Sequence, residues 1–347
     1  MNSHLQPVDA IMLKESIRKL VERENLTVDE AAGAMEEIMS GRATPAQIAA
    51  FLVSMRIKGE TVDEITGCAT VMRDKVTRLN PTRRPLIDTC GTGGDGARTF
   101  NISTTAAFVV AGAGVAVAKH GNRGVSSMSG SADVLEQLGV RIDNEPASVE
   151  RSIDEIGIGF MFAPIYHGAM KYAIGPRREI GIRTIFNMLG PLTNPAFADT
   201  QLIGVYDCGI VEPLAQVLKR LGVRHAFVVC GFDGLDEVTT TAPSLIAETR
   251  EGEVTLFEFD PSEVGVNRAR PEDLAGADPP ANARTLLEVL QGQKGPRRDI
   301  VVLNAAFALV AAGQVNSISE GIEAASRSID SGAAFDKLQR LREVSSR

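Results

Sequence analysis

The chain has 347 residues, a formal net charge of −8 and a hydrophobic content of 44%, which together indicate a globular protein with one large and one small domain. The negative charge argues against a general nucleic-acid binder, which would present a basic face. Neither a membrane-spanning apolar run of roughly 20 residues nor the apolar core of a secretory signal is recognisable, so we expect a cytoplasmic protein without a membrane partner.

Residues 10–78 are predicted to form helices, because apolar residues such as Leu13 and Ile17 recur at helical spacing. Thr27 and Thr61 each begin a Thr-Val-Asp-Glu sequence that is typical of a capping box at a helix N-terminus. Thr44-Pro45 supplies a further N-cap, with proline at the first helical position. The sequence therefore predicts a small N-terminal helical bundle.

Beyond a linker rich in proline and arginine at 80–85, strands and helices are expected to alternate. Strands are predicted near 86–89, 115–118, 159–163, 202–206 and 226–230. This alternation favours a mostly parallel sheet. An antiparallel hairpin is expected over 245–259, and two further helices, about 297–313 and 318–330, are expected to close the chain.

The four cysteines are widely scattered, at Cys68, Cys90, Cys208 and Cys230, with no CxxC spacing. They are interpreted as buried thiols in a reducing compartment. Because Cys and His residues are not clustered, we do not expect a zinc site, and any metal would be bound through oxygen atoms.

A glycine-rich turn follows the first predicted strand, with four glycines between Gly91 and Gly96 and Asp95 among them. Glycines let backbone N–H groups converge on one point, and the helix expected from Ser103 adds its own free N–H groups. The turn therefore predicts a phosphate site, although such a turn can also be only a tight connection. Asp95 does not suit anion capture, and we expect it to orient a hydroxyl, a metal or a metal-bound water.

The second predicted strand ends in a basic turn over 119–123, which is followed by several serines. Because carboxyl ends of parallel strands lie on one edge of a sheet, this turn should be a neighbour of the glycine-rich turn. Lys119 can act as a point charge for phosphate, and the serines can donate to its oxygens. The alternative is that Lys119 and Arg123 are solvated loop charges.

Two further groups suggest a metal and an organic acid. Asp236 and Glu237 follow a strand ending near Cys230, and adjacent carboxylates on a turn suit Mg²⁺, although such pairs are often only solvated. Arg177 could hold a carboxylate through two parallel N–H bonds or form a surface salt bridge with Glu179.

Four features of the chain together resemble one enzyme family. They are GTGGD followed by TFNIST, KHGNR followed by SGSADVLE, RREIGIRTIFNMLGPLTNP, and the Asp236-Glu237 pair. In this order and spacing they are similar to anthranilate phosphoribosyltransferases over nearly the whole chain. The resemblance implies transfer of phosphoribosyl from phosphoribosyl pyrophosphate to the amine of anthranilate, with Mg²⁺ as cofactor, in tryptophan biosynthesis. It also implies a homodimer through the helical domain, and leaves association with anthranilate synthase components open.

The fold that the resemblance implies is α/β, of the nucleoside phosphorylase/phosphoribosyltransferase class. A small N-terminal helical domain, 1–80, would be joined by 167–190 packing back onto it. A large α/β domain, 81–347, would carry a mostly parallel central sheet and bind phosphoribosyl pyrophosphate.

The resemblance also assigns site residues. Phosphoribosyl pyrophosphate would contact Gly91, Gly94, Asp95, Thr99, Asn101, Ile102, Ser103, Thr104, Lys119, His120, Gly121, Asn122, Arg123, Gly124, Val125, Ser126, Ser127 and Ser131. Anthranilate would lie against Gly91, Asn122, His167, Met170 and Arg177. Ser103, Asp236 and Glu237 would hold the metal. No residue stands out as a general base, and that role is unassigned.

Two departures from the usual family pattern concern the substrates. Gly168 stands where proline is common, and Met128 stands where a lysine is common. The nearest alternative function is a pyrimidine nucleoside phosphorylase, which would use free phosphate and would not need the Asp236-Glu237 pair. A dinucleotide-binding dehydrogenase lacks support because no acidic residue follows about 20 positions after the glycine-rich turn, at the end of the second strand. A non-catalytic phosphate-binding module is the third alternative.

Overall fold

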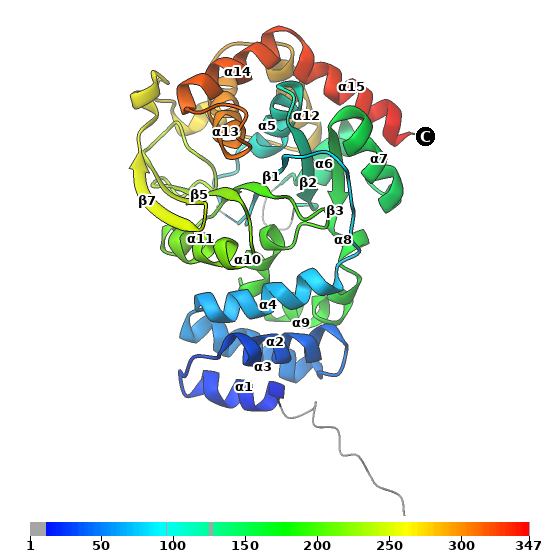
Figure 1. Ribbon diagram of the computed structural model, residues 1–347, viewed down its shortest axis with the longest axis vertical. Helices are drawn as coiled ribbons and strands as arrows, with labels where there is room; N and C mark the ends of the chain where they lie inside the picture. Colours follow the sequence, from blue (N-terminus) through cyan, green and yellow to red (C-terminus); the bar gives the residue numbers. More distant parts are fainter. Residues whose placement is uncertain (1–11, 95, 125–127, 347) are drawn as a thin grey trace, which may run out of the picture. The chain divides into compact units, whose positions relative to one another are not determined.

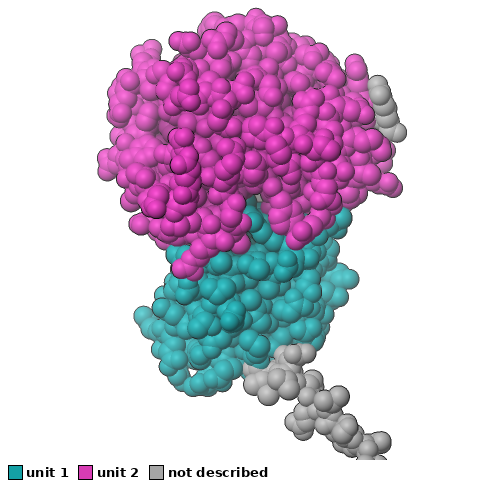
Figure 2. All heavy atoms as spheres, in the orientation of Figure 1, with its two compact units in different colours: residues 1–77, 167–193 teal, residues 78–166, 194–347 magenta. Residues whose placement is uncertain are grey.

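The computed structural model describes residues 12–94, 96–124 and 128–346, and the chain divides into two compact units (Figures 1 and 2). Unit 1 comprises the described residues up to Thr77 together with His167–Thr193. Unit 2 comprises the described residues of Arg78–Tyr166 and those from Asn194 onward.

Unit 1 is built from helices contributed by two separate stretches of the chain. The first stretch forms α1 (Met12–Val21), α2 (Val28–Met39), α3 (Pro45–Lys58) and α4 (Val62–Lys75). The second forms η2 (Gly168–Tyr172), α9 (Ile174–Ile180) and α10 (Ile185–Leu192). Capping boxes are present at Thr27, Thr44 and Thr61, so the helix starts predicted there are confirmed.

Polar side chains connect the helices inside unit 1. Glu64 is fully buried, accepts from the backbone N–H of Leu26 at 2.9 Å and pairs with Lys58 at 3.0 Å. Arg73 Nε donates to the carbonyl of Leu192 at 2.7 Å. Since Leu192 belongs to the later stretch, this bond joins α10 to the first four helices.

Unit 2 contains a seven-stranded sheet in the order β3-β2-β1-β4-β5-β6-β7. Its strands are β1 (Leu86–Gly91), β2 (Ala116–Gly121), β3 (Ile158–Phe162), β4 (Thr200–Gly204), β5 (His225–Gly231), β6 (Ser244–Arg250) and β7 (Glu253–Phe259). The first five strands pair in parallel, and β6 and β7 add an antiparallel hairpin. The predicted mostly parallel sheet and its hairpin are confirmed.

Helices cover both faces of this sheet. They are α5 (Ile102–Gly112), α6 (Ser131–Gln137), α7 (Pro146–Ile156), α8 (Ala163–Tyr166), α11 (Val211–Arg220), α12 (Pro279–Leu290), α13 (Pro296–Ala311), α14 (Ile318–Asp330) and α15 (Ala333–Ser345), with short η3 (Cys208–Ile210), η4 (Pro261–Val264) and η5 (Pro271–Leu274). Figure 1 shows α5, α13 and α14 on one side of the strands and α11 on the other. No helix of the described residues could cross a lipid bilayer.

The largest apolar core of unit 2 gathers around α5 and α13. Helix α5 buries nearly every residue from Ile102 to Ala111, and Phe307 of α13 meets the rings of Phe227 and Phe259 edge-on. A helix that is apolar on all sides belongs in the interior of a large domain. The short helix α5 is therefore held rigidly, and its N-terminus points to a fixed place at the sheet edge.

The expectation of four free thiols is wrong for one pair. Cys208 and Cys230 form a disulfide, with an S–S distance of 2.16 Å, between η3 and the end of β5. Cys68 and Cys90 are free. The sequence did not reveal the pair, because 22 residues separate the two cysteines and only the return of the chain from β4 to β5 brings them together.

Candidate active site

The carboxyl ends of the parallel strands of unit 2 form one edge, where the glycine-rich turn lies. Strands β1 and β4 end together, with Gly91 opposite Gly204. The glycine-rich turn leaves β1 at this edge, and the segment carrying Asp236 and Glu237 follows β5 two strands away. The sheet therefore brings together two groups of residues that lie far apart in sequence.

Asp236 contacts the glycine-rich turn directly. Its Oδ2 atom accepts a hydrogen bond from the backbone N–H of Gly93 at 2.9 Å. A Cβ atom on Gly91 would collide with the same oxygen, so a side chain there would displace the carboxylate. Glycine at position 91 therefore lets Asp236 approach the turn in this position.

Glu237 binds the N-terminus of α5 in a similar way. Its Oε1 atom accepts from the backbone N–H of Ser103 at 3.1 Å, in the first turn of the helix. Free N–H groups and the helix dipole favour a negative group at this place. Two predicted phosphate-binding segments therefore already hold carboxylate oxygens, which establishes that their N–H groups can receive an anion.

The donor set around Ser103, Asp236 and Glu237 fits magnesium better than a softer metal. Two carboxylates and a hydroxyl are hard oxygen donors, and Mg²⁺ typically uses one or two carboxylates, several waters and substrate phosphate. Over the described parts of the chain, no group of three or more His, Cys, Asp and Glu side chains could hold a metal alone. The residues present fit an ion that substrate oxygens help to bind.

Lys119 does not lie in a loop, and the prediction of its place is wrong. Strand β2 continues through Gly121, and the Lys119 side chain is only 4% exposed, with Nζ donating to the carbonyl of Thr89. Burial lowers the pKa of Lys119, while the negative charge of Asp88 opposes that shift. The alternative that Lys119 is a solvated loop charge is wrong as well.

Asp88 and Asn194 are polar residues near Lys119 to which the sequence analysis gave no role. Asp88 Oδ1 accepts from the backbone N–H of His120 at 3.2 Å, and its Oδ2 accepts from Asn194 Nδ2 at 2.7 Å. Burial raises the pKa of Asp88, and the charge of Lys119 and these hydrogen bonds oppose the shift. A buried acid in the strand before the glycine-rich turn was visible in sequence, but its partners were not.

The turn after β2 is organised by acidic residues. Asp133 Oδ2 accepts from the backbone N–H groups of Gly124 and Gly130, at 2.9 and 2.8 Å. Arg123, which is exposed, pairs with Asp133 at 3.0 Å and with Glu136 at 2.5 Å. The guanidinium predicted to bind phosphate is therefore engaged with two carboxylates at the surface.

Other predicted residues lie within the same unit. Asn101 Nδ2 donates to the carbonyl of Ser129 at 3.1 Å, and its Oδ1 accepts from Asn282 Nδ2 at 3.1 Å. Ser131 Oγ donates to the carbonyl of Asn122 at 3.3 Å. Gly94 and Thr99 are half-buried in the glycine-rich segment, and Ile102 and Thr104 are buried in the first turn of α5. Asp95, Val125, Ser126 and Ser127 lie outside the described residues.

Arg177 lies on α9 of unit 1 and is half-buried. Its Cζ atom is 4.9 Å from the ring centroid of Phe186, and burial lowers the pKa of the guanidinium. Among the described residues no carboxylate pairs with Arg177, so the alternative of a salt bridge with Glu179 is wrong. Arg178 and Glu179 are exposed instead.

Two of the other residues predicted for the acceptor, His167 and Met170, are neighbours of Arg177 in sequence, whereas Gly91 and Asn122 belong to unit 2. His167 and Met170 are half-buried, and the backbone N–H of Met170 donates to the carbonyl of His167 at 2.9 Å. Burial lowers the pKa of His167 to about 4, so its ring is neutral at neutral pH. Gly168 is exposed, and Met128 of unit 2 is 60% exposed.

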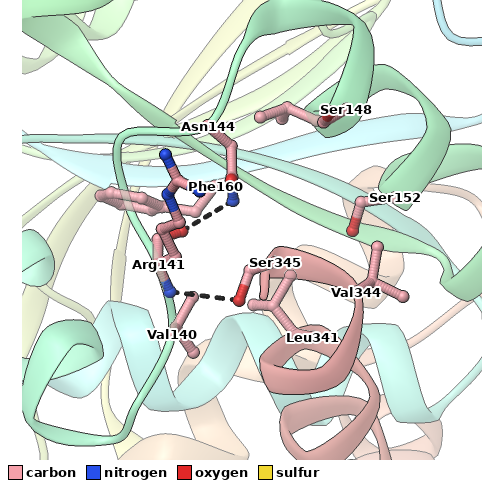
Figure 3. Close-up of a pocket in the computed structure, with 10 residues that line it drawn as sticks. Val140, Arg141, Asn144, Ser148, Ser152, Phe160, Leu341, Val344 and Ser345 are labelled. Carbon is pink, nitrogen blue, oxygen red and sulfur yellow. Dashed lines mark hydrogen bonds between the residues drawn. The ribbon is translucent and has the colours of Figure 1, made fainter. Parts of the chain in front are cut away.

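A small cavity in unit 2 holds none of the predicted site residues. It lies beside α15, where the Arg141 backbone N–H donates to Ser345 Oγ at 3.1 Å and Asn144 Nδ2 donates to the Arg141 carbonyl at 2.9 Å (Figure 3). Its volume of about 10 Å³ is near the limit for one water molecule. This cavity cannot hold an organic substrate.

Family models match both parts of the chain. The α/β domain of the glycosyl transferase family matches residues 83–335, and its helical bundle domain matches residues 14–76. An anthranilate phosphoribosyltransferase of Moorella thermoacetica is 58% identical over 330 residues, covering 95% of this chain and 97% of the relative. One of Symbiobacterium thermophilum is 56% identical over 335 residues, covering 96% and 98%.

Solved structures agree with these relatives. A crystal structure of anthranilate phosphoribosyltransferase from Thermus thermophilus has a TM-score of 0.91 and 41% identity, covering 96% of this chain and 99% of that one. The Saccharomyces cerevisiae enzyme, solved in complex with PRPP and Mg, has a TM-score of 0.89 and 27% identity, covering 97% and 98%. Given this identity and coverage, the chain belongs to the anthranilate phosphoribosyltransferase family.

Proposed function

We propose that this chain transfers the phosphoribosyl group of phosphoribosyl pyrophosphate to the amine of anthranilate, giving N-(5-phosphoribosyl)anthranilate and pyrophosphate in tryptophan biosynthesis. The observation that carries the proposal is the pair of carboxylates, Asp236 and Glu237, bound to the N–H groups of Gly93 and Ser103. These bonds support the proposal, because a magnesium-bound pyrophosphate needs both N–H donors and hard oxygen ligands.

The reaction places negative charge on the leaving pyrophosphate and positive character on the ribose. Fixed N–H donors in the glycine-rich turn and at the start of α5 would stabilise the pyrophosphate without reorganising. Asp236, Glu237 and Ser103 would hold Mg²⁺, which when bound neutralises charge on the phosphate oxygens. Lys119, on the adjoining strand, would add a positive charge near the same edge.

Arg177 would hold the carboxylate of anthranilate. Its guanidinium is half-buried, rests on an aromatic ring and has no carboxylate partner among the described residues. A carboxylate that accepts two parallel N–H bonds would stabilise a partly desolvated guanidinium of this kind. The amine of anthranilate is already a neutral nucleophile, so positioning can matter more than a strong base.

We propose further that the two units act as the two domains expected from the sequence, and that two chains associate through unit 1. Ile57, Ile174 and Ile182 of unit 1 are at least half exposed, and an association of two chains through this unit could remove these apolar side chains from water. Light scattering coupled to size exclusion should give twice the chain mass. A single-chain mass would contradict the proposal.

The proposed reaction is tested by anthranilate fluorescence. Fluorescence should fall only when phosphoribosyl pyrophosphate and magnesium are both present, and equimolar pyrophosphate should appear. The pyrimidine nucleoside phosphorylase alternative, which the family relatives do not favour, predicts instead that phosphate releases base from a pyrimidine nucleoside. Turnover of the nucleoside without turnover of anthranilate would overturn the proposed function.

A further inference from the structure

A cluster of buried polar groups lies under the carboxyl end of β2. It consists of Asp88 on β1, Lys119 on β2 and Asn194 in the segment before β4, and their exposed fractions are 0%, 4% and 3%. Charged residues are rarely this buried unless they are compensated. Of the three residues, only Lys119 has a proposed role in phosphate binding.

Hydrogen bonds fix the Asp88 carboxylate on both of its oxygens. One oxygen accepts from the backbone N–H of His120, and the other accepts from Asn194 Nδ2. Asn194 Nδ2 also donates to the carbonyl of Ala118 at 2.9 Å, and its Oδ1 accepts from the N–H of Ala196 at 2.9 Å. Each bond connects Asp88 or Asn194 to the backbone around β2 or to the segment that leads into β4.

The charge of Lys119 is compensated mainly through this cluster. Its Nζ atom donates to the carbonyl of Thr89, which is a neutral partner. Among the acids that act on Lys119, Asp88 has the largest effect, and it favours the charged form of the ammonium against burial. A buried charge that loses its counter-charge is costly, so the position and charge of Lys119 depend on Asp88.

We propose that Asp88 and Asn194 are positioning residues for phosphoribosyl pyrophosphate, acting through Lys119 and through the backbone at His120. Asp88 supplies the counter-charge of Lys119 and fixes the end of β2, while Asn194 orients the Asp88 carboxylate. This inference rests on the proposed function, which assigns phosphate binding to Lys119. Neither residue touches the substrate, because both are buried behind the strand end.

The first test is Asp88→Asn in the full-length enzyme at saturating magnesium. Asparagine has the same shape and keeps an oxygen for the His120 N–H, but it removes the negative charge, and its amide nitrogen cannot accept from Asn194 Nδ2. The Michaelis constant for phosphoribosyl pyrophosphate should rise about tenfold, the effect expected from losing a charge-assisted interaction. The Michaelis constant for anthranilate should stay within about twofold of the wild-type value, because the interaction concerns only phosphoribosyl pyrophosphate.

A matched control separates this effect from general destabilisation. Thr249 is also buried, and its Oγ1 donates to the carbonyl of Ala215 at 2.9 Å, between β6 and α11. Thr249→Val should lower the melting temperature without changing either Michaelis constant. If it raises the phosphoribosyl pyrophosphate constant as much as Asp88→Asn does, the positioning role is overturned.

A double variant tests whether Asp88 acts on phosphoribosyl pyrophosphate binding through Lys119. In a Lys119→Met background, Asp88→Asn should raise the Michaelis constant for phosphoribosyl pyrophosphate by less than about twofold, because the ammonium that Asp88 positions is absent. Additive effects would overturn the inference and leave the proposed function standing. An unchanged constant in Lys119→Met alone would instead overturn the phosphate role of Lys119 and the inference with it.

A second variant, Asn194→Ala, tests the same positioning role if Asp88→Asn fails to fold. Asn194→Ala leaves both charges in place and removes the donor that orients Asp88. It should raise the phosphoribosyl pyrophosphate constant by about threefold or more, again less than additively with Lys119→Met. A folded Asn194→Ala enzyme with both constants unchanged would overturn the role of Asn194.

Discussion

At the scale of single residues, the roles proposed for Arg177 and for the carboxylates at the sheet edge concern different substrates. Arg177→Ala is expected to raise the Michaelis constant for anthranilate much more than that for phosphoribosyl pyrophosphate, because the carboxylate is the only full charge on anthranilate. Losing a charge-assisted pair costs about 2–3 kcal/mol, hence roughly tenfold to a hundredfold in affinity. Steady-state kinetics with each substrate varied in turn would measure the difference.

Arg178→Ala is the control for this prediction. Arg178 is adjacent and exposed, and its loss should leave both constants nearly unchanged. If Arg178→Ala shows the anthranilate defect and Arg177→Ala does not, the carboxylate is held by the neighbouring residue. A normal constant in both variants would assign the carboxylate to another group.

The double change Asp236→Asn with Glu237→Gln is expected to lower turnover steeply. Both replacements keep an oxygen that can accept from Gly93 and Ser103, so the turn should persist. The magnesium site, however, loses the negative charge of both carboxylate ligands. Raised magnesium should restore part of the activity, which a magnesium titration would measure. Wild-type turnover at low magnesium would leave the two residues as structural acceptors only.

The residue scale is also where the sequence was least informative. Basic residues next to glycine predicted a loop at Lys119, but β2 runs on through Gly121 and buries the side chain. Asp88 finds its amide partner 106 residues further along the chain. Local patterns report periodicity and turn chemistry, and they carry no information on a hydrogen-bond partner supplied from so far away.

At the scale of elements, the alternating pattern predicted all five parallel strands and the hairpin, because each strand is a short apolar run bounded by turn residues. The final helix, α15, was missed. Ala334, Leu338 and Leu341 are buried at helical spacing, so a signal existed, but it was weak among many charged residues. Helix caps were predicted best, since a capping box depends only on residues three apart.

An ion pair joins α14 to α13, and its contribution to stability can be tested by pH. Arg298 is buried at 5% side-chain exposure and binds both oxygens of Asp330, which is 49% exposed, at 2.6 and 2.9 Å. The guanidinium lowers the pKa of Asp330 to about 2. The resulting stability is present above the unfolded value near 4 and is lost as pH falls toward 2.

Asp330→Asn should therefore destabilise the protein by about 1 kcal/mol at neutral pH, a figure kept low because the carboxylate is half exposed. Urea unfolding at several pH values would show the difference from wild type narrowing between about pH 4 and pH 2. A difference independent of pH over that range would mean that packing, and not charge, joins the two helices.

The disulfide between η3 and β5 predicts how many cysteines an alkylating reagent can modify before and after reduction. In denaturant without reductant, an alkylating reagent should modify Cys68 and Cys90 only, because Cys208 and Cys230 are joined. After reduction all four should react, and intact mass spectrometry would read the difference. Four modifications before reduction would show that the pair is not oxidised in the purified protein.

At the scale of the whole molecule, unit 1 needs both of its stretches. Helices α9 and α10 pack on α3 and α4, and the Arg73–Leu192 bond joins the stretches. A fragment ending at Thr77 should therefore be less helical and unfold less cooperatively than the same fragment joined by a flexible linker to 167–193. Circular dichroism on heating would compare them, and equal transitions would show that the first four helices suffice.

The division of unit 1 has a consequence for synthesis on the ribosome. Domains commonly fold as they emerge, the N-terminal one first, but here the first helices leave the exit tunnel long before α9 and α10 exist. The nascent α1–α4 segment must wait while Arg78–Tyr166 is translated, with part of its apolar surface uncovered. A chaperone that binds exposed apolar segments would meet this chain early, and release would follow the arrival of residue 193.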